Sequence, residues 1–437
     1  MWICSQIGAR EHYAIPRALH QTGQLATLYT DFWAGRALRR AQEMGVGRWE
    51  LGALRSLATR YHPELDGGRE IGDGRWEIEG GGQNAKISKH SAEIVSWNFR
   101  ALWWEGMLRR RQKAVVGGSY HGFIEVGRRF AERMREDLKR RKHLKSSSIF
   151  FAYDTGALET MEWCREQGIK CVLNQMDPNR VEVDLVRSEA KQWPGWALEN
   201  IQVPEAYFVR REQEWALADR VVVNSEFSRK ALVQQGVPAE KLVVIPLCYE
   251  RDEANRKSEI GNRKSEQALR VLFLGQVILR KGIQYLLAAA RQLERENIHF
   301  DVVGSIGLSK EAMATAPANV TFHGRAGRDQ ASDWYRKSHV FVLPTLSDGF
   351  AITQLEAMAH GLPVITTPCC GEVVSNGVDG FIVPPRDAKA LAEALHRYLA
   401  EPDLLQTQQK AALEKSKLFT LGRLAENLRR VEDELKS

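Results

Sequence analysis

The sequence predicts an α/β protein with two doubly wound, Rossmann-like domains that face each other across a cleft. Short runs of β-branched residues alternate with helical patterns in both halves of the chain, which is typical of parallel sheets covered by helices on both faces. A length of 437 residues is also more than one domain usually holds. A polar stretch near the middle separates the two series of runs.

The first domain is predicted to occupy residues 1–250. Its expected strands are WICSQI, LATLYTD, SIFFAYD, IKCVLNQ, RVVVNS and LVVIPLC. Helical patterns near residues 11–21, 157–167, 205–218 and 226–235 lie between or beside these strands. The segment 32–147, which is rich in Gly, Arg and Trp, interrupts this rhythm and is predicted to be an irregular, partly helical insertion.

The second domain is predicted at residues 269–420. Its expected strands are VLFLG, HFDVVG, VTFHG, HVFVLPT, LPVITT and GFIVP, with helical patterns near 283–294, 330–337 and 351–360. Residues 251–268 between the domains are almost wholly polar and repeat NRKSE, so they predict an exposed linker. A C-terminal helix is expected at 421–437, and a crossing back to the first domain is one option for it.

The overall composition is that of an ordinary soluble protein, with 43% apolar and 27% charged residues. Six cysteines without a CxxC pattern argue against structural disulfides and favour a reducing compartment. The chain shows neither a signal-peptide pattern nor an apolar run near the ~20 residues that span a bilayer. We therefore expect a cytoplasmic protein, either soluble or peripheral at the inner face of the membrane.

A strongly basic stretch lies inside the insertion, where residues 100–145 hold 14 Lys and Arg against 5 Asp and Glu. Trp97, Trp103 and Trp104 precede the arginines at 109–111. Tryptophans beside basic residues suit an anionic membrane surface, so residues 97–145 are a candidate for peripheral membrane contact. The more common alternative is a solvated basic helix. No nucleic-acid recognition motif accompanies the charge, and nucleic acid is not an expected partner.

A cationic pair stands at the end of the loop that follows the strand VLFLG. Arg280 and Lys281 directly precede Gly282, where a helix is expected to begin. Because ligands bind beyond the carboxyl ends of parallel strands, and because helix N-termini attract anions, this pair is a candidate anion site. Basic pairs are also common on solvated surfaces.

A carboxylate, Glu356, lies in a helix that looks half buried. The loop LSDGF precedes this helix, and Gly349 permits a close backbone approach there. Thr353 and Glu356 are three residues apart and hence on one helix face, at the edge of the packing stripe. Such a carboxylate can accept two hydroxyl hydrogen bonds, as a ribose would offer, or pair with a neighbouring cation.

A glycine-rich loop follows at residues 366–387. It contains Gly371, Gly377 and Gly380 and the adjacent Cys369 and Cys370. Such loops often approach a ligand through their backbone, although they also serve as ordinary turns.

In this order and spacing, the three stretches resemble the donor-binding half of the retaining family-4 glycosyltransferases (glycosyl transferases group 1), which have the GT-B fold. Lys281-Gly282 matches the family's Lys-Gly, and Asp348 and Glu356 match the two acids of its E-x7-E motif. EAMAHGLPVITT matches the family's helix and strand, and the glycine-rich loop matches its final loop. The resemblance covers residues 218–400 well and residues 1–217 loosely.

The resemblance implies a retaining transferase that moves a sugar from a nucleotide-diphosphate sugar to a hydroxyl acceptor. A glycan or a lipid-linked glycan in polysaccharide biosynthesis is the expected acceptor. No cofactor is expected to be required. No metal is expected either, since GT-B enzymes do not generally need one and no DxD motif ends a strand.

By the same resemblance, Glu356 would hold the nucleotide ribose, and its hydrogen-bonding partner would be absent until the nucleotide binds. Lys281, helped by Arg280, would neutralise the diphosphate, and Asp348 would lie by the donor sugar. The base would bind near Arg325. The other donor-binding candidates are Gly8, Gln276 and Gly349 together with the loop residues Phe350, Ala351, Ile352 and Thr353. The backbone N–H groups of residues 350–353 would cradle the phosphates.

The sequence departs from the family pattern in four places. Asp348 replaces the usual Glu, Gln276 replaces the usual Arg, and Cys369-Cys370 stands where glycines are usual. Met176 stands where a His is expected at the end of a first-domain strand. The neighbours Asn174, Gln175 and Asp177 are alternatives for the role of that His.

The first domain is expected to bind the acceptor. Arg10 and His12 follow the first strand, and Asp154 closes the strand SIFFAYD. These residues and His121 are the acceptor-side candidates. A nucleotide-sugar epimerase or hydrolase on the same fold, or a catalytically weakened binding protein, remain alternatives. A NAD-dependent dehydrogenase is not expected, because no GxGxxG follows the first strand.

Overall fold

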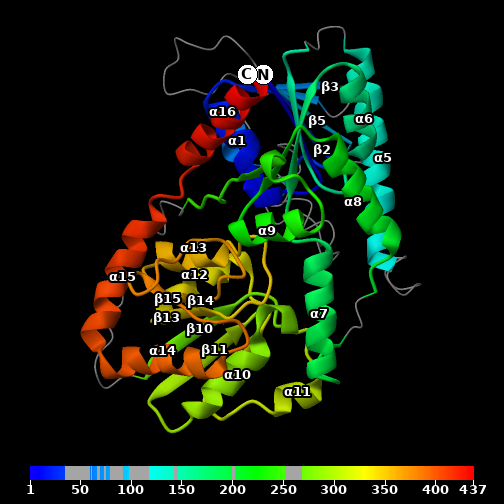
Figure 1. The fold of residues 1–437 in the computed structure, drawn as a ribbon. Helices are drawn as coiled ribbons and strands as arrows, with labels where there is room; N and C mark the ends of the chain where they lie inside the picture. The colour runs from blue at the N-terminus through cyan, green and yellow to red at the C-terminus, as the bar shows by residue number, and fades with distance from the viewer. Residues whose placement is uncertain are drawn as a thin grey trace, which may run out of the picture.

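In the computed structural model, the described residues are 1–34, 60, 62–65, 69–72, 75–78, 92–97, 118–141, 146–198, 202–250 and 268–437. They form two α/β halves, each built on its own sheet (Figure 1). The predicted α/β class with two separate sheets is therefore confirmed. The linker predicted at 251–268 lies almost wholly outside the described residues, as do Trp103, Trp104 and the arginines at 109–111.

The first sheet has the strand order β3-β4-β5-β2-β1-β6-β7-β8-β9. Its strands are β1 (Trp2–Gln6), β2 (Leu25–Thr30), β3 (Arg69–Gly72), β4 (Arg75–Ile78), β5 (Ala92–Ser96), β6 (Ile149–Tyr153), β7 (Lys170–Gln175), β8 (Arg220–Val223) and β9 (Leu242–Val244). All neighbouring strands are parallel except that β4 runs antiparallel to both β3 and β5.

The segment 32–147 differs from its prediction as an irregular, partly helical insertion. Its described residues include β3, β4 and β5, which extend the first sheet, and the long helix α5 (Gly118–Arg140). The sequence RWEI of β4 alternates polar and apolar residues, which is a strand pattern. In the structure Trp76 and Ile78 are buried while Glu77 is exposed.

Helices cover both faces of the first sheet. One apolar core joins the sheet to α5 through Phe130 and Met134, and a second joins its other face to α1 through Ala18 and Leu19. The helices of this half are α1 (Ala14–Gln21), α5, α6 (Leu158–Glu166), α7 (Arg180–Gln192), α8 (Glu205–Leu217) and α9 (Glu226–Gln234).

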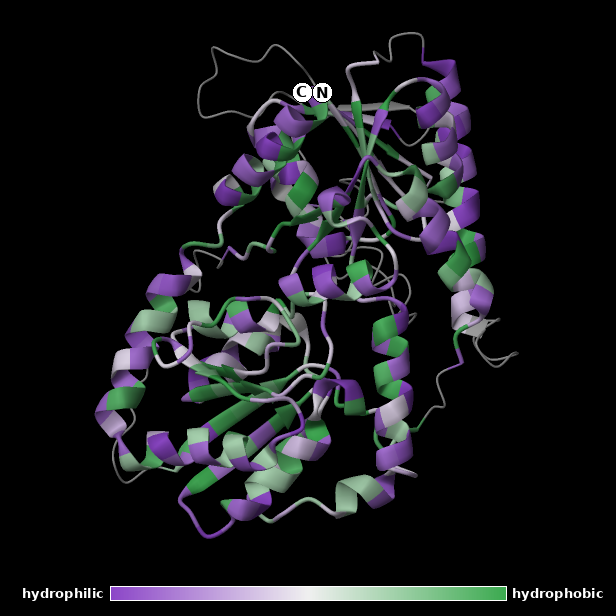
Figure 2. Cartoon of the chain, in the orientation of Figure 1, coloured by the Kyte–Doolittle hydropathy of each residue, from purple (hydrophilic) through white to green (hydrophobic). Residues whose placement is uncertain are grey.

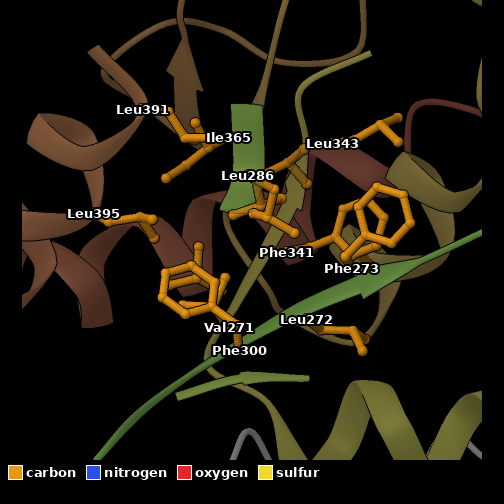
Figure 3. Packing of buried hydrophobic residues seen from close by; sticks show 14 of the residues in the cluster. Val271, Leu272, Phe273, Leu286, Phe300, Phe341, Leu343, Ile365, Leu391 and Leu395 are labelled. Atoms are coloured by element: carbon orange, nitrogen blue, oxygen red, sulfur yellow. The ribbon is translucent and has the colours of Figure 1, made fainter. Parts of the chain in front are cut away.

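The second sheet is parallel throughout and has the order β12-β11-β10-β13-β14-β15. Its strands are β10 (Leu269–Leu274), β11 (Ile298–Val303), β12 (Val320–Gly324), β13 (Val340–Leu343), β14 (Val364–Thr366) and β15 (Gly380–Ile382). Its helices are α10 (Ile283–Gln292), α11 (Lys310–Ala314), α12 (Arg328–Lys337), α13 (Thr353–Ala359), α14 (Ala388–Ala400) and α15 (Pro402–Ser416). Side chains of strands and helices interlock in its core, including Phe273, Phe300 and Leu286 (Figure 3).

Hydropathy explains this layering. The central strands of both sheets are hydrophobic along most of their length, whereas the helices alternate between polar and apolar faces (Figure 2). Strands buried on both faces need such continuous apolar runs, and covering helices need only one apolar face. Among the described helices, none combines the length and the hydrophobicity that a membrane crossing requires.

The last helix, α16 (Leu421–Lys436), packs against α1, so the two chain ends lie close together (Figure 1). Leu428 and Val431 are buried in this contact, and the indole Nε1 of Trp2 donates to Glu432 Oε2 at 2.9 Å. Helix α7 makes the opposite crossing, because it follows β7 of the first sheet yet packs on the second half. Its buried Glu189 accepts hydrogen bonds from Gln284 and Tyr285 of α10.

Candidate active site

Lys281 closes the 3₁₀ turn η5 (Leu279–Lys281) at the carboxyl end of β10. Gly282 follows with φ of 74°, and a Cβ at that position would lie 1.8 Å from the carbonyl oxygen of Pro344. Only glycine fits such a left-handed, crowded position, so it fixes where Lys281 stands. The Lys281 ammonium group forms an ion pair with Asp348, and both side chains are largely buried, at 13% and 14% exposure. The structure thus brings together two of the predicted site residues.

Asp348 lies in the loop between β13 and α13 and has a second partner besides Lys281. Its Oδ1 accepts the backbone N–H of Ala351 at 3.1 Å. Burial raises the pKa of Asp348, but the positive charges of Lys281 and Arg280 outweigh burial and hold the pKa below its usual value. Asp348 is therefore ionised at neutral pH.

Arg280 connects the loop between β13 and α13 to the other half of the chain. Its Nη1 donates to the carbonyl oxygen of Ser347 at 2.8 Å and lies 3.4 Å from Glu182 Oε2. The Ser347 hydroxyl donates to the same Glu182 oxygen at 2.8 Å. Burial raises the pKa of Glu182 to about 6, although Arg280 opposes this. Sequence reasoning missed Glu182, because nothing local marks a first-turn glutamate of α7 as the partner of a residue 98 positions away.

The loop before α13 differs from its prediction in two respects. The helix begins at Thr353 rather than near Ala351, because Ala351 has a φ of 65° and cannot continue a right-handed helix. The amide of Ala351 donates to Asp348, so it does not point freely toward a phosphate. Phe350 packs its ring against Gly371, and Ile352 and Thr353 are partly buried.

Gly349 is where this loop touches the first half of the chain. A Cβ at Gly349 would lie 1.9 Å from the carbonyl oxygen of Met176, so the contact leaves no room for a side chain. Met176, which stands where a His was expected, follows the end of β7. The loop between β13 and α13 and the carboxyl edge of the first sheet therefore meet backbone to backbone.

Glu356 lies in α13, one turn beyond this loop. Its Oε2 accepts the hydroxyl of Tyr335, on α12, at 2.8 Å. The prediction that this carboxylate has no hydrogen-bonding partner until a nucleotide binds is therefore wrong. The donor, Tyr335, lies 21 residues away in the sequence, and its ring stacks on the ring of His360.

Gln276 and Arg325 are exposed on the loops that follow β10 and β12. They share the carboxyl edge of the second sheet with Lys281, but β11 separates their strands.

A cavity of about 420 Å³ opens at the carboxyl edge of the first sheet. It contains the predicted residues Gly8, Arg10 and Asp154 as well as Met176. The other lining residues are Ser5, Gln6, Ile7, Asp31, Arg60, Phe123, Val126, Phe130, Tyr153, Thr155, Gly156, Asp177 and Tyr207. His12 and His121 are exposed and do not line the cavity. The aromatic residues on α5 and α8 come from outside the predicted loops, which is why sequence reasoning missed them.

Asp154 is buried beside Arg211, with which it forms an ion pair. Arg211 Nη2 also lies 2.8 Å from Asp177 Oδ1. Burial raises the pKa of Asp154 even though Arg211 lowers it. Arg211 thus joins two acidic residues, Asp154 and Asp177, that both line the cavity.

The three alternatives to Met176 have different surroundings. Asn174 lies in β7 and donates from Nδ2 to Glu11 at 3.5 Å. Gln175 accepts the indole N–H of Trp215 at 2.8 Å, which is a structural link to α8. Asp177 lines the cavity. Within the described part of the chain, no group of three or more His, Cys, Asp or Glu residues is placed to hold a metal ion.

Comparison with known proteins relates part of the chain to a family. Residues 268–401 match the family model "Glycosyl transferases group 1". A D-inositol 3-phosphate glycosyltransferase of Kribbella flavida is 30% identical over 246 residues, which is 51% of this chain and 58% of that protein. The capsular polysaccharide biosynthesis glycosyltransferase CapM of Staphylococcus aureus is 26% identical over 219 residues, 46% of this chain and 57% of that protein. The chain thus matches less than two thirds of the length of these relatives.

A solved structure matches nearly the whole chain. Anabaena Alr3699/HepE, in complex with UDP and glucose, superposes with a TM-score of 0.57 at 12% identity and covers 98% of each chain. At that identity the likeness shows the fold, which is the GT-B arrangement of two Rossmann-like domains. Residues 268–401 of the chain are therefore similar to the group 1 glycosyl transferases.

Proposed function

We propose that this protein is a retaining glycosyltransferase that moves a sugar from a nucleotide-diphosphate sugar to a hydroxyl acceptor. The observation that carries the proposal is the buried Lys281–Asp348 pair with Arg280 beside it, at the carboxyl edge of the second sheet. Open parallel sheets bind ligands at that edge. The match of residues 268–401 to the group 1 family supports the same assignment.

In this proposal the second half binds the donor. Lys281 and Arg280 neutralise the diphosphate, and Asp348 lies by the donor sugar. Glu356 holds the ribose hydroxyls together with, or in place of, the hydroxyl of Tyr335. Cations fixed in a largely buried site stabilise charge on the departing diphosphate better than they would in water, because their orientation is already set.

The first half binds the acceptor, and its cavity is the proposed site. The bond between the anomeric carbon and the diphosphate oxygen breaks, and the acceptor oxygen bonds to that carbon on the same face while its proton is released. The close approach of Gly349 to Met176 supports this division, because it joins the donor loop to the strand end beside the cavity. We propose a glycan or lipid-linked glycan as acceptor, which the polysaccharide role named for CapM supports.

We further propose that the protein works in the cytoplasm and contacts the inner face of the membrane through residues 97–145. Of that stretch, the described residues are 97 and 118–141. Sedimentation with anionic liposomes at low salt tests the contact. Failure to sediment under those conditions would remove the membrane from the proposal.

The function is tested first with a panel of UDP-, GDP- and ADP-sugars, scored by thermal shift. The stabilising sugar nucleotide is then incubated with sugar and lipid-linked acceptors, and proton NMR determines the anomeric configuration of the product. We expect transfer with retention. Products formed from the donor without any acceptor would instead indicate an epimerase or hydrolase, and binding without turnover would indicate a binding protein.

A further inference from the structure

Three polar side chains lie in a row across the carboxyl edge of the first sheet. Tyr153 of β6 is in register with Asn174 of β7. Ser5 of β1 is in register with Ala152, which places the next residue of β1, Gln6, beside Tyr153. Paired residues of parallel strands point to the same face, so Gln6, Tyr153 and Asn174 form one polar row. Gln6 and Tyr153 also line the cavity.

A strained turn brings a carboxylate onto this row. Glu11, His12 and Tyr13 have φ angles of 49°, 55° and 60°, so three consecutive residues other than glycine are left-handed. Such backbone strain persists only where surrounding contacts enforce it, and it concentrates at functional sites. The turn directs Glu11 to Tyr153, whose hydroxyl donates to Oε2 at 3.1 Å, and to Asn174, whose Nδ2 donates to Oε1 at 3.5 Å.

The row also contains hydrogen-bond acceptors for which the described residues supply no donor. The side-chain oxygens of Gln6 and Asn174 are buried, and no hydrogen-bond partner for either lies within the described chain. Both residues are almost inaccessible, at 2% and 0% exposure. The Gln6 amide nitrogen donates to the carbonyl oxygen of Gly8 at 2.9 Å, which fixes the orientation of the side chain. A buried oxygen without a donor is unfavourable, so a bound hydroxyl that donates to it is stabilised.

We propose that Glu11 is a positioning residue that prepares this row to bind a hydroxyl-donating acceptor. The proposal rests on the glycosyltransferase function proposed above. The ionised carboxylate accepts one hydrogen bond from the Tyr153 hydroxyl and one from the Asn174 amide. The phenol oxygen then presents only lone pairs to a ligand, and the amide oxygen of Gln6, which also lines the cavity, stands beside it. Groups of this kind bind molecules that donate several hydroxyl hydrogen bonds, which points to a neutral polyol or sugar.

Aromatic residues that line the cavity fit the same class of acceptor. Phe123 and Tyr207 line it, and the apolar face of a sugar ring packs well on aromatic side chains. Sequence reasoning named the neighbours Arg10 and His12 as acceptor candidates, whereas the structure points to the residue between them.

The charge on Glu11 makes this preparation depend on pH. Burial raises the pKa of Glu11 to about 7, although Tyr153, Arg10 and Asn174 lower it. Arg10 lies on the same turn, Tyr153 on β6, and Cys248 on the segment that follows β9. At a pH above this pKa the ionised carboxylate accepts a hydrogen bond from the Tyr153 hydroxyl. At a pH below this pKa the carboxyl is protonated, so it can donate a hydrogen bond itself and compete with a ligand hydroxyl for the acceptors of the row.

Binding of phenyl β-D-glucopyranoside, measured by ligand-observed NMR between pH 5.5 and 8.5, tests the proposal. The wild type is expected to bind this probe at least threefold more tightly at the higher pH. Glu11→Gln should bind it weakly and with no pH dependence, and Tyr153→Phe should do the same. Glu240→Gln, an exposed glutamate in the same half of the chain, is the matched control and should behave as wild type.

UDP affinity, measured by calorimetry on the same samples, separates the two proposals. We expect it to be unchanged in Glu11→Gln and Tyr153→Phe. If the wild type binds UDP but not the glucoside, or if Glu11→Gln keeps the wild-type affinity and pH dependence, the positioning role is overturned and the donor assignment stands. If no nucleotide binds the wild type, the proposed function itself fails. Tyr153→Phe, which removes one oxygen atom, carries the test if Glu11→Gln does not fold.

Discussion

Replacing Lys281 by alanine is expected to weaken the binding of UDP by about tenfold to about 150-fold. In the proposed complex the lysine donates a charged hydrogen bond to the diphosphate, and such bonds contribute about 1.5–3 kcal/mol. Each 1.36 kcal/mol corresponds to a factor of ten in affinity. Burial places Lys281 in the upper part of this range, because a side chain that is 13% exposed is poorly screened by water.

The same geometry predicts the opposite effect at Asp348. This carboxylate already neutralises Lys281, so it competes with the diphosphate for the lysine and repels it. Asp348→Asn is therefore expected to bind UDP a few-fold more tightly, while sugar transfer falls because the carboxylate by the donor sugar is gone. Changes of opposite sign at two paired residues cannot arise from general damage to the fold.

Isothermal titration calorimetry with UDP measures both effects, and the loss in Lys281→Ala should shrink as salt is raised. Lys389→Ala is the matched control, because its side chain is 79% exposed on α14. Steady-state kinetics of Lys281→Ala should show at least a tenfold loss of turnover. Unchanged UDP affinity together with an unchanged rate would refute the placement of the diphosphate at Lys281.

Three further outcomes follow from particular contacts. Gly349→Ala should lower the rate of sugar transfer in kinetic assays at least tenfold with little change in UDP affinity. The added Cβ would lie 1.9 Å from the Met176 carbonyl oxygen and force the two halves apart. Gly422→Ala is the control and should leave the rate unchanged, because the nearest atom to its added Cβ is 3.8 Å away. Since the pKa of Glu11 rises from 4.5 to about 7 on folding, the free energy of unfolding should fall by up to about 3 kcal/mol between pH 4.5 and 7. Urea denaturation of Glu11→Gln at pH 5 and pH 8 should show that this decline is gone, and a decline equal to that of wild type would contradict the burial of the carboxyl. Leu428→Ala should cost about 2–5 kcal/mol in the same assay, because Leu428 is fully buried; a smaller loss would mean that α16 contributes little.

The sequence by itself determined the features that local patterns encode. Apolar runs such as VLFLG predicted buried parallel strands, and β10 lies where that run stands. Lys281 and Glu356 stood out because they follow strand ends and lie at a helix start or on a helix face, whereas Asp348 was identified through the resemblance to the family's E-x7-E motif. The structure pairs Lys281 with Asp348 across 67 residues of sequence, although the sequence analysis had given the two residues separate roles.

Tertiary structure decided the features that depend on contacts between distant segments. The cavity needs Tyr207 from α8 beside Gly8, and neither position is unusual in its own sequence context. Local sequence supplied no partner for Glu356, because the Tyr335 hydroxyl that donates to it lies on another helix, 21 residues away. Glu11 is a plain glutamate in the sequence, and only the left-handed turn and its contacts with Tyr153 and Asn174 make it a half-buried, hydrogen-bonded carboxylate. Local patterns carry the period of a strand or helix, whereas desolvation and hydrogen bonding arise from atoms that only folding brings together.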